Sequence, residues 1–464
     1  MTEATRDQSR PNPLSIHDLE SRINGEVITP TDDIYDEARS TYYNIDKRPA
    51  VIVRPVDASN VATVVTRARE TGTELAVRSG GHNLAGHSVT EGGILLNLSE
   101  MKDLAIDLED RTAWAGSGLT AGEYTVAVGE HGLATGFGDT GSVGVGGITL
   151  GGGIGLLVRK YGLTIDSLLA AEIVTADGQI LEVNEESHPD LFWAIRGGGG
   201  NFGVVTHFKF RLHEVPSIVG GFLVLPPAPE VIEGFVGASQ AAPEELSTIG
   251  NVMKAPPMPF LPPEHHGKPV LFAILTYAGD TKTGEEVISR FRQLAEPIVD
   301  MTGPKTYPEM FPPEGGPEMD PAAEFHSHNL FADSIDLADA RHIVSEIEAS
   351  DSAMAAVQLR VLGGAMARVP ADATAFAHRD RAIMVNVAAV STGSEGSGAA
   401  SAWAGNLADT LADGDAAYVN FIGDDSPEAV GAAYPQPTRD RLVEIKGKYD
   451  PGNLFRNNYN IPPG

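Results

Sequence analysis

The 464-residue chain contains no cysteine. Disulfide bonds, thiolate nucleophiles, cysteine-ligated zinc and iron–sulfur clusters are therefore excluded. The chain has no run of about 18 apolar residues, so no membrane span is expected. Residues 1–13 are polar and lack the apolar centre of a signal peptide. These absences lead us to expect a cytoplasmic protein.

Positive charge is also scarce, because 33 Lys and Arg residues stand against 63 Asp and Glu residues. The resulting formal net charge of −30 repels phosphate backbones, so we expect no nucleic-acid partner. Such a surface also suits a salt-tolerant source, although ordinary acidic solubility is the simpler explanation. A chain of this length is expected to form two or three structural units.

The first part of the chain has the pattern of a β-α-β unit. Residues 51–54 are a short apolar run, and residues 58–71 repeat apolar side chains at helical spacing after Asp57, a helix-capping residue. Residues 75–78 form the next strand pattern, which leads directly into a glycine turn. From residue 93 to 215 the chain reads mostly as short strands, with a hairpin over 173–183, a short helix over 190–196 and a strand over 204–212.

The composition changes near Pro216, where prolines become frequent. Strand-like runs at 270–276, 356–362 and 382–390 then alternate with helical stretches, and a final helix ends near residue 449. We therefore predict an α+β protein in three parts. Residues 1–215 form a first domain, residues 216–410 form a second α+β domain, and residues 411–464 form a C-terminal segment.

Glycine is abundant, with 52 residues in the chain, and most of the excess lies in clusters between positions 80 and 203. The first cluster, Arg78-Ser-Gly-Gly-His-Asn83, follows a strand. Successive backbone N–H groups in such a loop can bind an anion such as a diphosphate, and the His82 ring would lie against that ligand. The alternative is a glycine turn in which the histidine makes a structural hydrogen bond.

The second cluster spans residues 140–155 and contains eight glycines in sixteen residues. This composition does not predict an ordinary core element, because glycine costs entropy and packs nothing. Interleaved apolar residues such as Val143 and Ile148 also argue against a flexible linker. The segment is typical of a wall against a flat ligand, and a tightly packed turn is the alternative.

The third cluster, residues 196–203, places Gly198, Gly200 and Gly203 in a G-x-G-x-x-G pattern. A dinucleotide fingerprint needs a strand before the glycines and a helix after them. Here the helix comes first and the strand follows, so we reject a Rossmann site. The phosphate-binding pattern G-x-x-x-x-G-K-[ST] is absent as well.

Taken together and in order, these segments resemble the FAD-linked oxidases of the berberine-bridge-enzyme-like family, which share the vanillyl-alcohol-oxidase flavin fold. The matching segments are Arg78-Ser-Gly-Gly-His-Asn83, Gly146-Gly-Ile-Thr-Leu-Gly-Gly-Gly153, Arg159-Lys-Tyr-Gly-Leu163, Asp190-Leu-Phe-Trp-Ala-Ile-Arg-Gly-Gly-Gly199, Asn201-Phe-Gly-Val-Val-Thr206 and Lys448-Tyr-Asp-Pro-Gly-Asn-Leu-Phe455. The resemblance implies a two-part PCMH-type FAD-binding domain. It also implies an inserted α+β substrate domain, built as an antiparallel sheet covered by helices.

The resemblance further implies that FAD is bound covalently through an 8α-histidyl link to His82. His87 lies five residues later and is a rival for the bond. A second, cysteinyl link occurs in some relatives; we place its position at Gly144, and the lack of cysteine leaves a single link. Val143 stands where relatives control the access of dioxygen to the flavin, and a small valine indicates an oxidase.

The expected FAD-binding residues come from all three glycine clusters and from the C-terminal segment. They are Arg78, Ser79, Gly80, Gly81, His82, Asn83, His87, Ser88, Thr140, Gly141, Val143, Gly144, Val145, Gly147, Gly151, Gly152, Gly203, Val204, Val205, Asn458 and Asn460.

The resemblance also implies that a C-terminal Tyr-x-Asn strand and a polar strand of the second domain face the substrate, and we expect catalytic residues in three pairs whose i, i+2 spacing places each pair on one face of a strand. They are Tyr418 and Asn420, Gln358 and Arg360, and His326 and His328. A tyrosine or a histidine could take the substrate proton, whereas Asn420 cannot act as a base. Each pair also has a structural alternative, and the histidines show no third ligand for a metal site.

These features predict an FAD-dependent oxidase of a small alcohol, amine or phenolic substrate, with dioxygen reduced to hydrogen peroxide. The alternatives are a flavin dehydrogenase with another electron acceptor and a catalytically silent flavin-binding protein. The sequence gives no sign of an oligomeric state or of a macromolecular partner.

Overall fold

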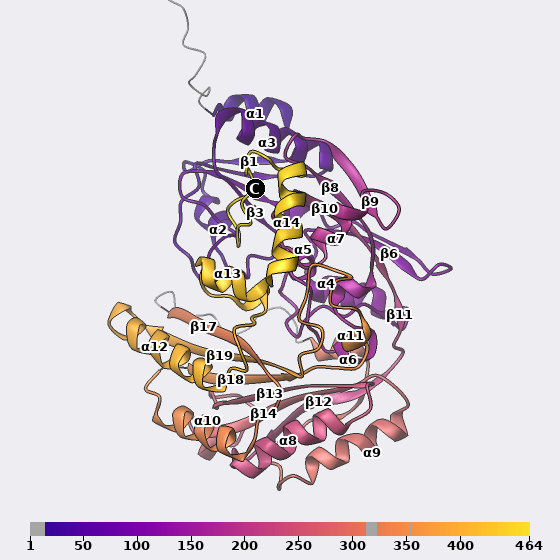
Figure 1. Ribbon diagram of the computed structural model, residues 1–464, viewed down its shortest axis with the longest axis vertical. Helices are drawn as coiled ribbons and strands as arrows, with labels where there is room; N and C mark the ends of the chain where they lie inside the picture. Colours follow the sequence, from indigo (N-terminus) through magenta and orange to yellow (C-terminus); the bar gives the residue numbers. More distant parts are fainter. Residues whose placement is uncertain (1–13, 312–322, 353) are drawn as a thin grey trace, which may run out of the picture.

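A computed structural model describes residues 14–311, 323–352 and 354–464. Figure 1 shows the N-terminal elements in the upper part of the molecule and the elements from β12 to α12 in the lower part. The C-terminal helices α13 (Pro427–Ala433) and α14 (Gln436–Tyr449) return to the upper part. None of the helices in the described ranges combines the length and apolar character needed to cross a bilayer.

The N-terminal sheet has the strand order β1-β2-β4-β3. Its strands are β1 (Glu26–Ile28), β2 (Val51–Arg54), β3 (Leu75–Arg78) and β4 (Ile94–Asn97), and both β2 and β3 run parallel to β4. The connection between β2 and β3 is helix α3 (Ala58–Thr71), which begins where the Asp57 carboxylate accepts the N–H of Asn60. The predicted β-α-β unit is confirmed.

A second, antiparallel sheet follows in the order β5-β6-β10-β8-β9. Its strands are β5 (Leu104–Asp107), β6 (Thr112–Gly116), β8 (Leu168–Val174), β9 (Ile180–Asn184) and β10 (Val204–Arg211). The predicted hairpin is β8–β9, and the predicted short helix is α7 (Pro189–Ile195). Helix α4 (Ala121–Gly129) and the small pair β7 (Leu133–Ala134) and β11 (His213–Glu214) complete this region.

The glycine cluster at 140–155 contains a short helix, α5 (Val145–Leu150), although no ordinary core element was expected there. The side chains of Val145 and Thr149 on this helix are buried. Because its glycines have no side chains, the helix lies directly against the end of β3. This close contact compensates for the conformational entropy that the glycines lose on folding and for the side-chain packing that they lack.

A large antiparallel sheet forms the lower part of the molecule in the order β15-β12-β14-β13-β18-β19-β17, with β16 beside β12. Its main strands are β12 (Ile218–Leu225), β13 (Leu246–Lys254), β14 (Pro269–Tyr277), β17 (Ala323–Ala332), β18 (Met354–Val361) and β19 (Ile383–Thr392), with short edge strands β15 (Val299–Asp300) and β16 (Gly303–Lys305).

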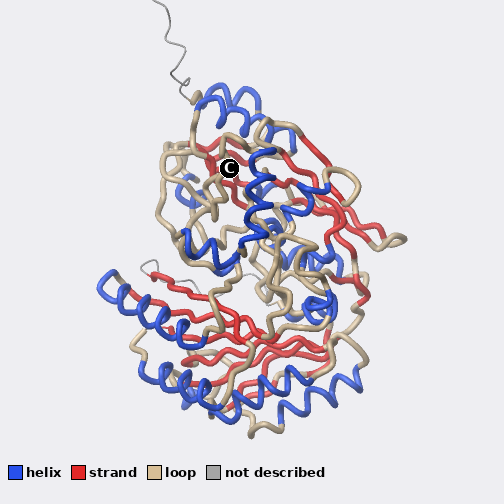
Figure 2. The backbone as a smooth tube through the Cα atoms, in the orientation of Figure 1, coloured by secondary structure: helices blue, strands red, loops and turns tan. Residues whose placement is uncertain are grey.

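One face of this sheet is covered by helices, as Figure 2 shows. The helices are α8 (Pro229–Ala241), α9 (Thr281–Arg292), α10 (Leu337–Ala349) and α12 (Ser394–Leu411). Buried side chains such as Phe235, Val357 and Leu407 form the core between the helices and the sheet. The opposite face of the sheet is left to meet the first part of the chain.

The short elements connect these layers. They are α1 (Ile16–Arg22), α2 (Tyr35–Arg39), η1 (Leu98–Glu100), α6 (Val158–Tyr161), η2 (Thr164–Ser167), η3 (Pro263–His265), η4 (Tyr307–Met310), α11 (Ala365–Arg368) and η5 (Val419–Phe421).

A buried ion pair holds the C-terminal segment on the upper part. Lys446 Nζ donates to Asp450 Oδ2 at 2.7 Å, and both side chains are fully buried. Lys446 also donates to the carbonyls of Asn201 and Phe455, while Asp450 accepts the N–H groups of Leu454 and Phe455. Both charges are thus paired and hydrogen-bonded, as burial requires.

Candidate functional site

A cavity of about 900 Å³ lies between the upper part of the molecule and the open face of the large sheet. Its lining includes the apolar residues Leu75 and Leu98 of the N-terminal unit and Phe455 of the C-terminal segment. Phe325, Gln358 and other residues of the large sheet also line it, together with the glycine loops. A cavity of this size is typical of a site for a sizeable organic ligand.

Two glycine loops meet in the middle of this cavity. A Cβ built on Gly80 would lie 2.2 Å from the Gly144 nitrogen, and a Cβ on Gly144 would lie 2.1 Å from the Gly80 nitrogen. Ser79 Oγ connects the same loops, because it donates to the Ser117 carbonyl at 2.6 Å and accepts the Gly146 N–H at 3.2 Å. Only glycine allows this backbone approach.

Gly144 is therefore the wrong position for a second covalent link. A side chain there would collide with the Gly80 backbone and with Ser79 Oγ, which lies 2.2 Å from a built Cβ. The alignment of the glycine cluster with relatives placed the link at a residue that cannot carry any side chain in this fold. The cavity is lined nearby by Thr140 and Val143 of the same segment.

His82 lines the cavity between the two loops. Its ring stacks on the Tyr42 ring with centroids 4.0 Å apart and an interplanar angle of 22°. Burial lowers the pKa of His82 to about 4, although a hydrogen bond to the Ser142 backbone acts in the opposite direction. The imidazole is therefore neutral at pH 7, which leaves one ring nitrogen as a nucleophilic lone pair.

Arg78 does not line the cavity, and its expected role in binding FAD stays a prediction. Its guanidinium is buried and donates to the carbonyls of Ala38, Arg39 and Ser40, and its Nε donates to the Ser88 carbonyl. Burial lowers the pKa of Arg78 to about 10, which still leaves it charged at pH 7. The side chain fixes the backbone on both sides of the loop that carries His82.

Several buried polar atoms beside the cavity have no hydrogen-bond partner in the described part of the chain. They are His87 Nδ1, Ser88 Oγ and Asn458 Oδ1. Unpartnered buried polar atoms are costly, so their gathering along one cavity indicates a polar ligand that satisfies them. His87 is held with its Nε2 3.6 Å from Asp425 Oδ2 and its ring edge-on to Tyr459.

Fifteen of the expected FAD-binding residues line the cavity. They are Ser79, Gly80, Gly81, His82, Asn83, His87, Ser88, Thr140, Val143, Gly144, Gly147, Gly203, Val204, Val205 and Asn458.

Apart from Arg78, the remaining expected FAD-binding residues do not line the cavity either. Gly141 accepts a backbone hydrogen bond from Gly122 on α4, and Val145 is fully buried. Gly151 lies against the Asn420 amide, and Gly152 lies against the Phe376 ring with φ +121°. Asn460 carries a buried, unpartnered Oδ1, but it lies outside the cavity lining.

Tyr418 and Asn420 line the cavity. They do not lie on a strand, although their spacing predicted one. Tyr418 precedes the 3₁₀ helix η5, and this turn brings Asn420 Nδ2 within 2.8 Å of Tyr418 Oη. The Tyr418 oxygen also accepts the N–H groups of Gly153 at 2.9 Å and Ile154 at 3.3 Å. Burial raises the pKa of Tyr418, while these donors and Arg360 lower it.

Gln358 and Arg360 lie on one face of β18 as predicted, and both line the cavity. Arg360 Nε donates to Gln358 Oε1 at 2.8 Å, and Arg360 Nη2 donates to Asp139 Oδ2 at 3.0 Å. Arg360 Nη1 binds the carbonyl of Ile154, whose N–H points at Tyr418. The guanidinium therefore ties the large sheet to the segment that holds the Tyr418 hydroxyl.

His326 and His328 share one face of β17, but it is the face covered by helix α12. His326 Nε2 lies 3.3 Å from Ser397 Oγ, and the His328 ring lies beside Gly405. His326 borders the cavity, while the neighbouring strand residues Phe325 and Ser327 have side chains on the open face. The period of a strand puts both histidines on the opposite side from Ser327, and their expected catalytic role stays a prediction.

Several residues that line the cavity were not predicted from the sequence. Tyr42 and Tyr43 belong to a segment without a motif, and Tyr43 packs on Phe325 with ring centroids 4.9 Å apart. Burial raises the pKa of Tyr43 to about 12. Asp139 and Asn386 also lie in the cavity. The only signal for Asp139 was its place beside the second glycine cluster.

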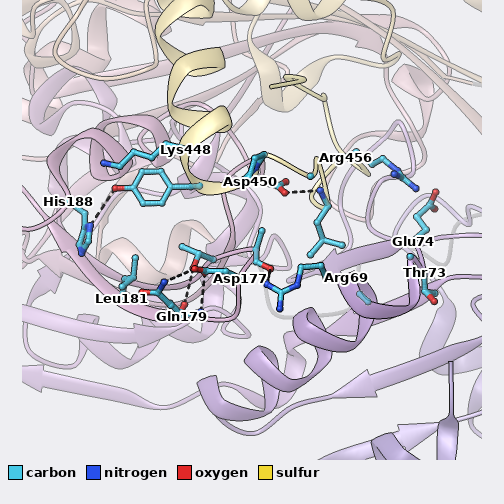
Figure 3. Close-up of a pocket in the computed structure, with 18 residues that line it drawn as sticks. Arg69, Thr73, Glu74, Asp177, Gln179, Leu181, His188, Lys448, Asp450 and Arg456 are labelled. Carbon is cyan, nitrogen blue, oxygen red and sulfur yellow. Dashed lines mark hydrogen bonds between the residues drawn. The ribbon is translucent and has the colours of Figure 1, made fainter. Parts of the chain in front are cut away.

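A second pocket of about 550 Å³ lies between the end of α3, the β8–β9 hairpin and the end of α14, as Figure 3 shows. Its polar groups are largely bonded to one another. Arg69 donates to the Ala176 carbonyl, Asp177 accepts from Gln179, and Tyr449 Oη lies 3.4 Å from His188 Nδ1. In the ranges that the structure describes, no cluster of three or more His, Asp or Glu side chains is placed to hold a metal ion.

Comparisons with known proteins show which family the chain is similar to. The family described as "FAD binding domain" matches residues 49–184, and the family described as "Berberine and berberine like" matches residues 417–462. The (R)-6-hydroxynicotine oxidase of Paenarthrobacter nicotinovorans is 31% identical over 460 residues, which cover 95% of this chain and 97% of that protein.

The solved structures agree. The crystal structure of 6-hydroxy-D-nicotine oxidase from Arthrobacter nicotinovorans superposes with a TM-score of 0.84 at 28% identity, covering 95% of this chain and 98% of that one. The glucooligosaccharide oxidase of Acremonium strictum shares the fold with a TM-score of 0.84 at 22% identity, over 97% of this chain and 100% of that one.

The chain therefore belongs to the berberine-bridge-enzyme-like family of FAD-dependent oxidoreductases. The cavity is consistent with FAD, because it offers unpartnered polar atoms, a glycine cradle and apolar lining residues. Gly147 and Gly200 add open space, since a Cβ on either would meet nothing within 4 Å.

Proposed function

We propose that this protein is an oxidase that takes a hydride from a small alcohol, amine or phenolic substrate. In this proposal FAD is held by a single covalent bond to His82, and dioxygen is reduced to hydrogen peroxide. The observation that carries the proposal is the continuity of one cavity from His82 to Tyr418, Gln358 and Arg360. A cofactor attached at His82 and a substrate on the large sheet would then share one enclosed space.

The residues that would hold FAD fall into two groups. Leu75, Leu98 and Phe455 offer apolar lining, and the backbone of the loops around Gly80 and Gly144 offers N–H groups for the polar chain. When bound, FAD supplies a ring that accepts a hydride, which no amino-acid side chain can do. The protein itself must position the substrate and remove its proton.

Tyr418 is the residue best placed to take that proton. Its oxygen accepts three N–H groups, from Gly153, Ile154 and Asn420. Three donors and the nearby Arg360 charge favour the phenolate, although burial outweighs them and raises the pKa of Tyr418. Asn420 then serves to orient the tyrosine, and Gln358 and Arg360 are polar groups for substrate oxygens or nitrogens.

Val143 supports the oxidase assignment over a dehydrogenase. It lines the cavity next to the glycine contact, where a small side chain leaves space beside the proposed flavin position. The relatives also favour small-molecule substrates, since the names of two of them specify hydroxynicotine and glucooligosaccharide. A dehydrogenase that reduces another acceptor is the second candidate.

The test is anaerobic mixing of the purified yellow protein with a panel of alcohols, amines and phenols. A substrate bleaches the visible flavin absorbance, and air then restores the colour with one hydrogen peroxide per turnover. Bleaching that air reverses only slowly, but that another electron acceptor reverses quickly, would support the dehydrogenase instead. A panel that never bleaches the flavin would favour a catalytically silent flavin-binding protein.

A further inference from the structure

Tyr42 is a large aromatic residue that contributes little to the core, since it is 44% exposed. Its ring nevertheless has a defined partner, because it lies almost parallel to the His82 ring at 4.0 Å between centroids. We propose that Tyr42 is a positioning residue that holds the His82 imidazole in the orientation from which it bonds to the flavin. The inference rests on the proposed covalent link to His82.

The backbone fixes Tyr42 in this place. The Tyr42 N–H donates to the Gly81 carbonyl at 3.2 Å, so the tyrosine is tied to the residue just before His82. The preceding segment is held by Arg78, which donates to the carbonyls of Arg39 and Ser40. Gly81 has φ +76°, a conformation that turns the chain so that His82 meets Tyr42.

The stack on Tyr42 restricts the imidazole to one plane. A neutral imidazole carries a proton on one ring nitrogen and a lone pair on the other. Tyr42 covers the imidazole while the ring still lines the cavity, and the lone pair is thus available to a ligand there.

Attachment is a balanced oxidation. One C–H bond of the flavin ring methyl and one imidazole N–H are lost, and one C–N bond forms. Dioxygen takes up the two hydrogens and becomes hydrogen peroxide. The protein contributes orientation to this reaction, which depends strongly on the angle between the nitrogen lone pair and the methyl carbon. Loss of the stack should therefore slow attachment more than it weakens flavin binding.

The experiment compares the wild-type protein with Tyr42→Ala, Tyr42→Leu and Tyr42→Phe, each purified as the full chain with the flavin it acquires during expression. Total flavin is measured by absorbance. The covalent fraction is the part that stays with the protein after acid precipitation. We expect at least a twofold lower covalent fraction in Tyr42→Ala and Tyr42→Leu, with bound but acid-released flavin making up the difference.

Tyr42→Phe is the matched control, because it keeps the flat ring and removes only the hydroxyl. It should retain the wild-type covalent fraction, a rescue that general damage to the fold does not predict. A wild-type covalent fraction in both Tyr42→Ala and Tyr42→Leu would overturn the inference alone. Flavin that acid releases from the wild-type protein itself would overturn the proposed His82 link and, with it, this inference.

Discussion

The backbones of Gly80 and Gly144 lie in direct contact, so neither residue can carry a side chain in this fold. One stands at the end of β3 in the N-terminal unit, and the other stands just before α5 in the second glycine cluster. Both glycines line the proposed flavin cavity, so the contact forms part of its wall.

Gly144→Ala should separate the two glycine loops. The added methyl would overlap the Gly80 backbone, and we expect a loss of about 1–3 kcal/mol in the free energy of unfolding together with a loss of bound flavin. Gly237→Ala on α8 is the control, since a Cβ there meets nothing within 4 Å. That variant should be unchanged or about 0.4–1 kcal/mol more stable in denaturant unfolding. A fully stable, fully flavinylated Gly144→Ala protein would contradict the structure of the site.

Asp450→Ala should release the C-terminal segment. It leaves the Lys446 charge buried without its partner, which costs about 3–5 kcal/mol in the free energy of unfolding. Residues that follow, including Phe455 and Tyr459, line the cavity, so flavin content should fall as well. Lys448→Ala breaks the more exposed pair with Asp190 and should cost only about 0–1 kcal/mol. Equal losses in the two variants would argue against a role for the buried pair.

Tyr418→Phe should keep its flavin but reduce it slowly. Removal of a general base lowers the rate of substrate-driven flavin reduction by about 10²–10⁴-fold in stopped-flow measurements. Because burial raises the pKa of Tyr418, the wild-type rate should increase with pH across the alkaline range, and the variant should lose that increase. Tyr434→Phe, which removes a buried hydroxyl bonded to the Gly197 carbonyl, is the control for loss of a tyrosine hydroxyl. Similar rates for both variants would remove Tyr418 from the mechanism.

His213 should make stability depend on pH in acid. Its ring stacks on Tyr161, and burial lowers the pKa of His213 to about 4, below the value of about 6.5 in an unfolded chain. Between these values the unfolded chain binds more protons, so stability falls as pH drops from about 6.5 to 4 and does not change through this group above 6.5. His213→Asn should flatten the slope of unfolding free energy against pH by up to about 1.4 kcal/mol per pH unit. The exposed His131→Asn change is the control, and an equal flattening there would contradict the assignment.

Local patterns predicted much of this fold. Helix α3 begins and ends at the predicted residues, because Asp57 caps it and Gly72 ends it in a left-handed conformation. Three strands of the large sheet, β14, β18 and β19, were also predicted, since their apolar runs are long. The glycine cluster at 140–155 misled the prediction, because its helix α5 depends on a contact with Ser79 and Gly80 that is remote in sequence.

The candidate site was predicted in part. The motif residues around His82 line the cavity, whereas Arg78 belongs to the same motif but hydrogen-bonds to backbone carbonyls. Spacing alone could not tell that His326 and His328 lie on the face of β17 that helix α12 covers. Tyr42 has no motif at all, and only the folded chain brings it onto His82.

The most direct test of the central claim is acid precipitation of the wild-type protein, His82→Ala and His87→Ala. The account predicts that flavin colour stays in the pellet for the wild type and for His87→Ala, and moves to the supernatant for His82→Ala. Colour that remains in the His82→Ala pellet would place the covalent bond on another residue and contradict the account.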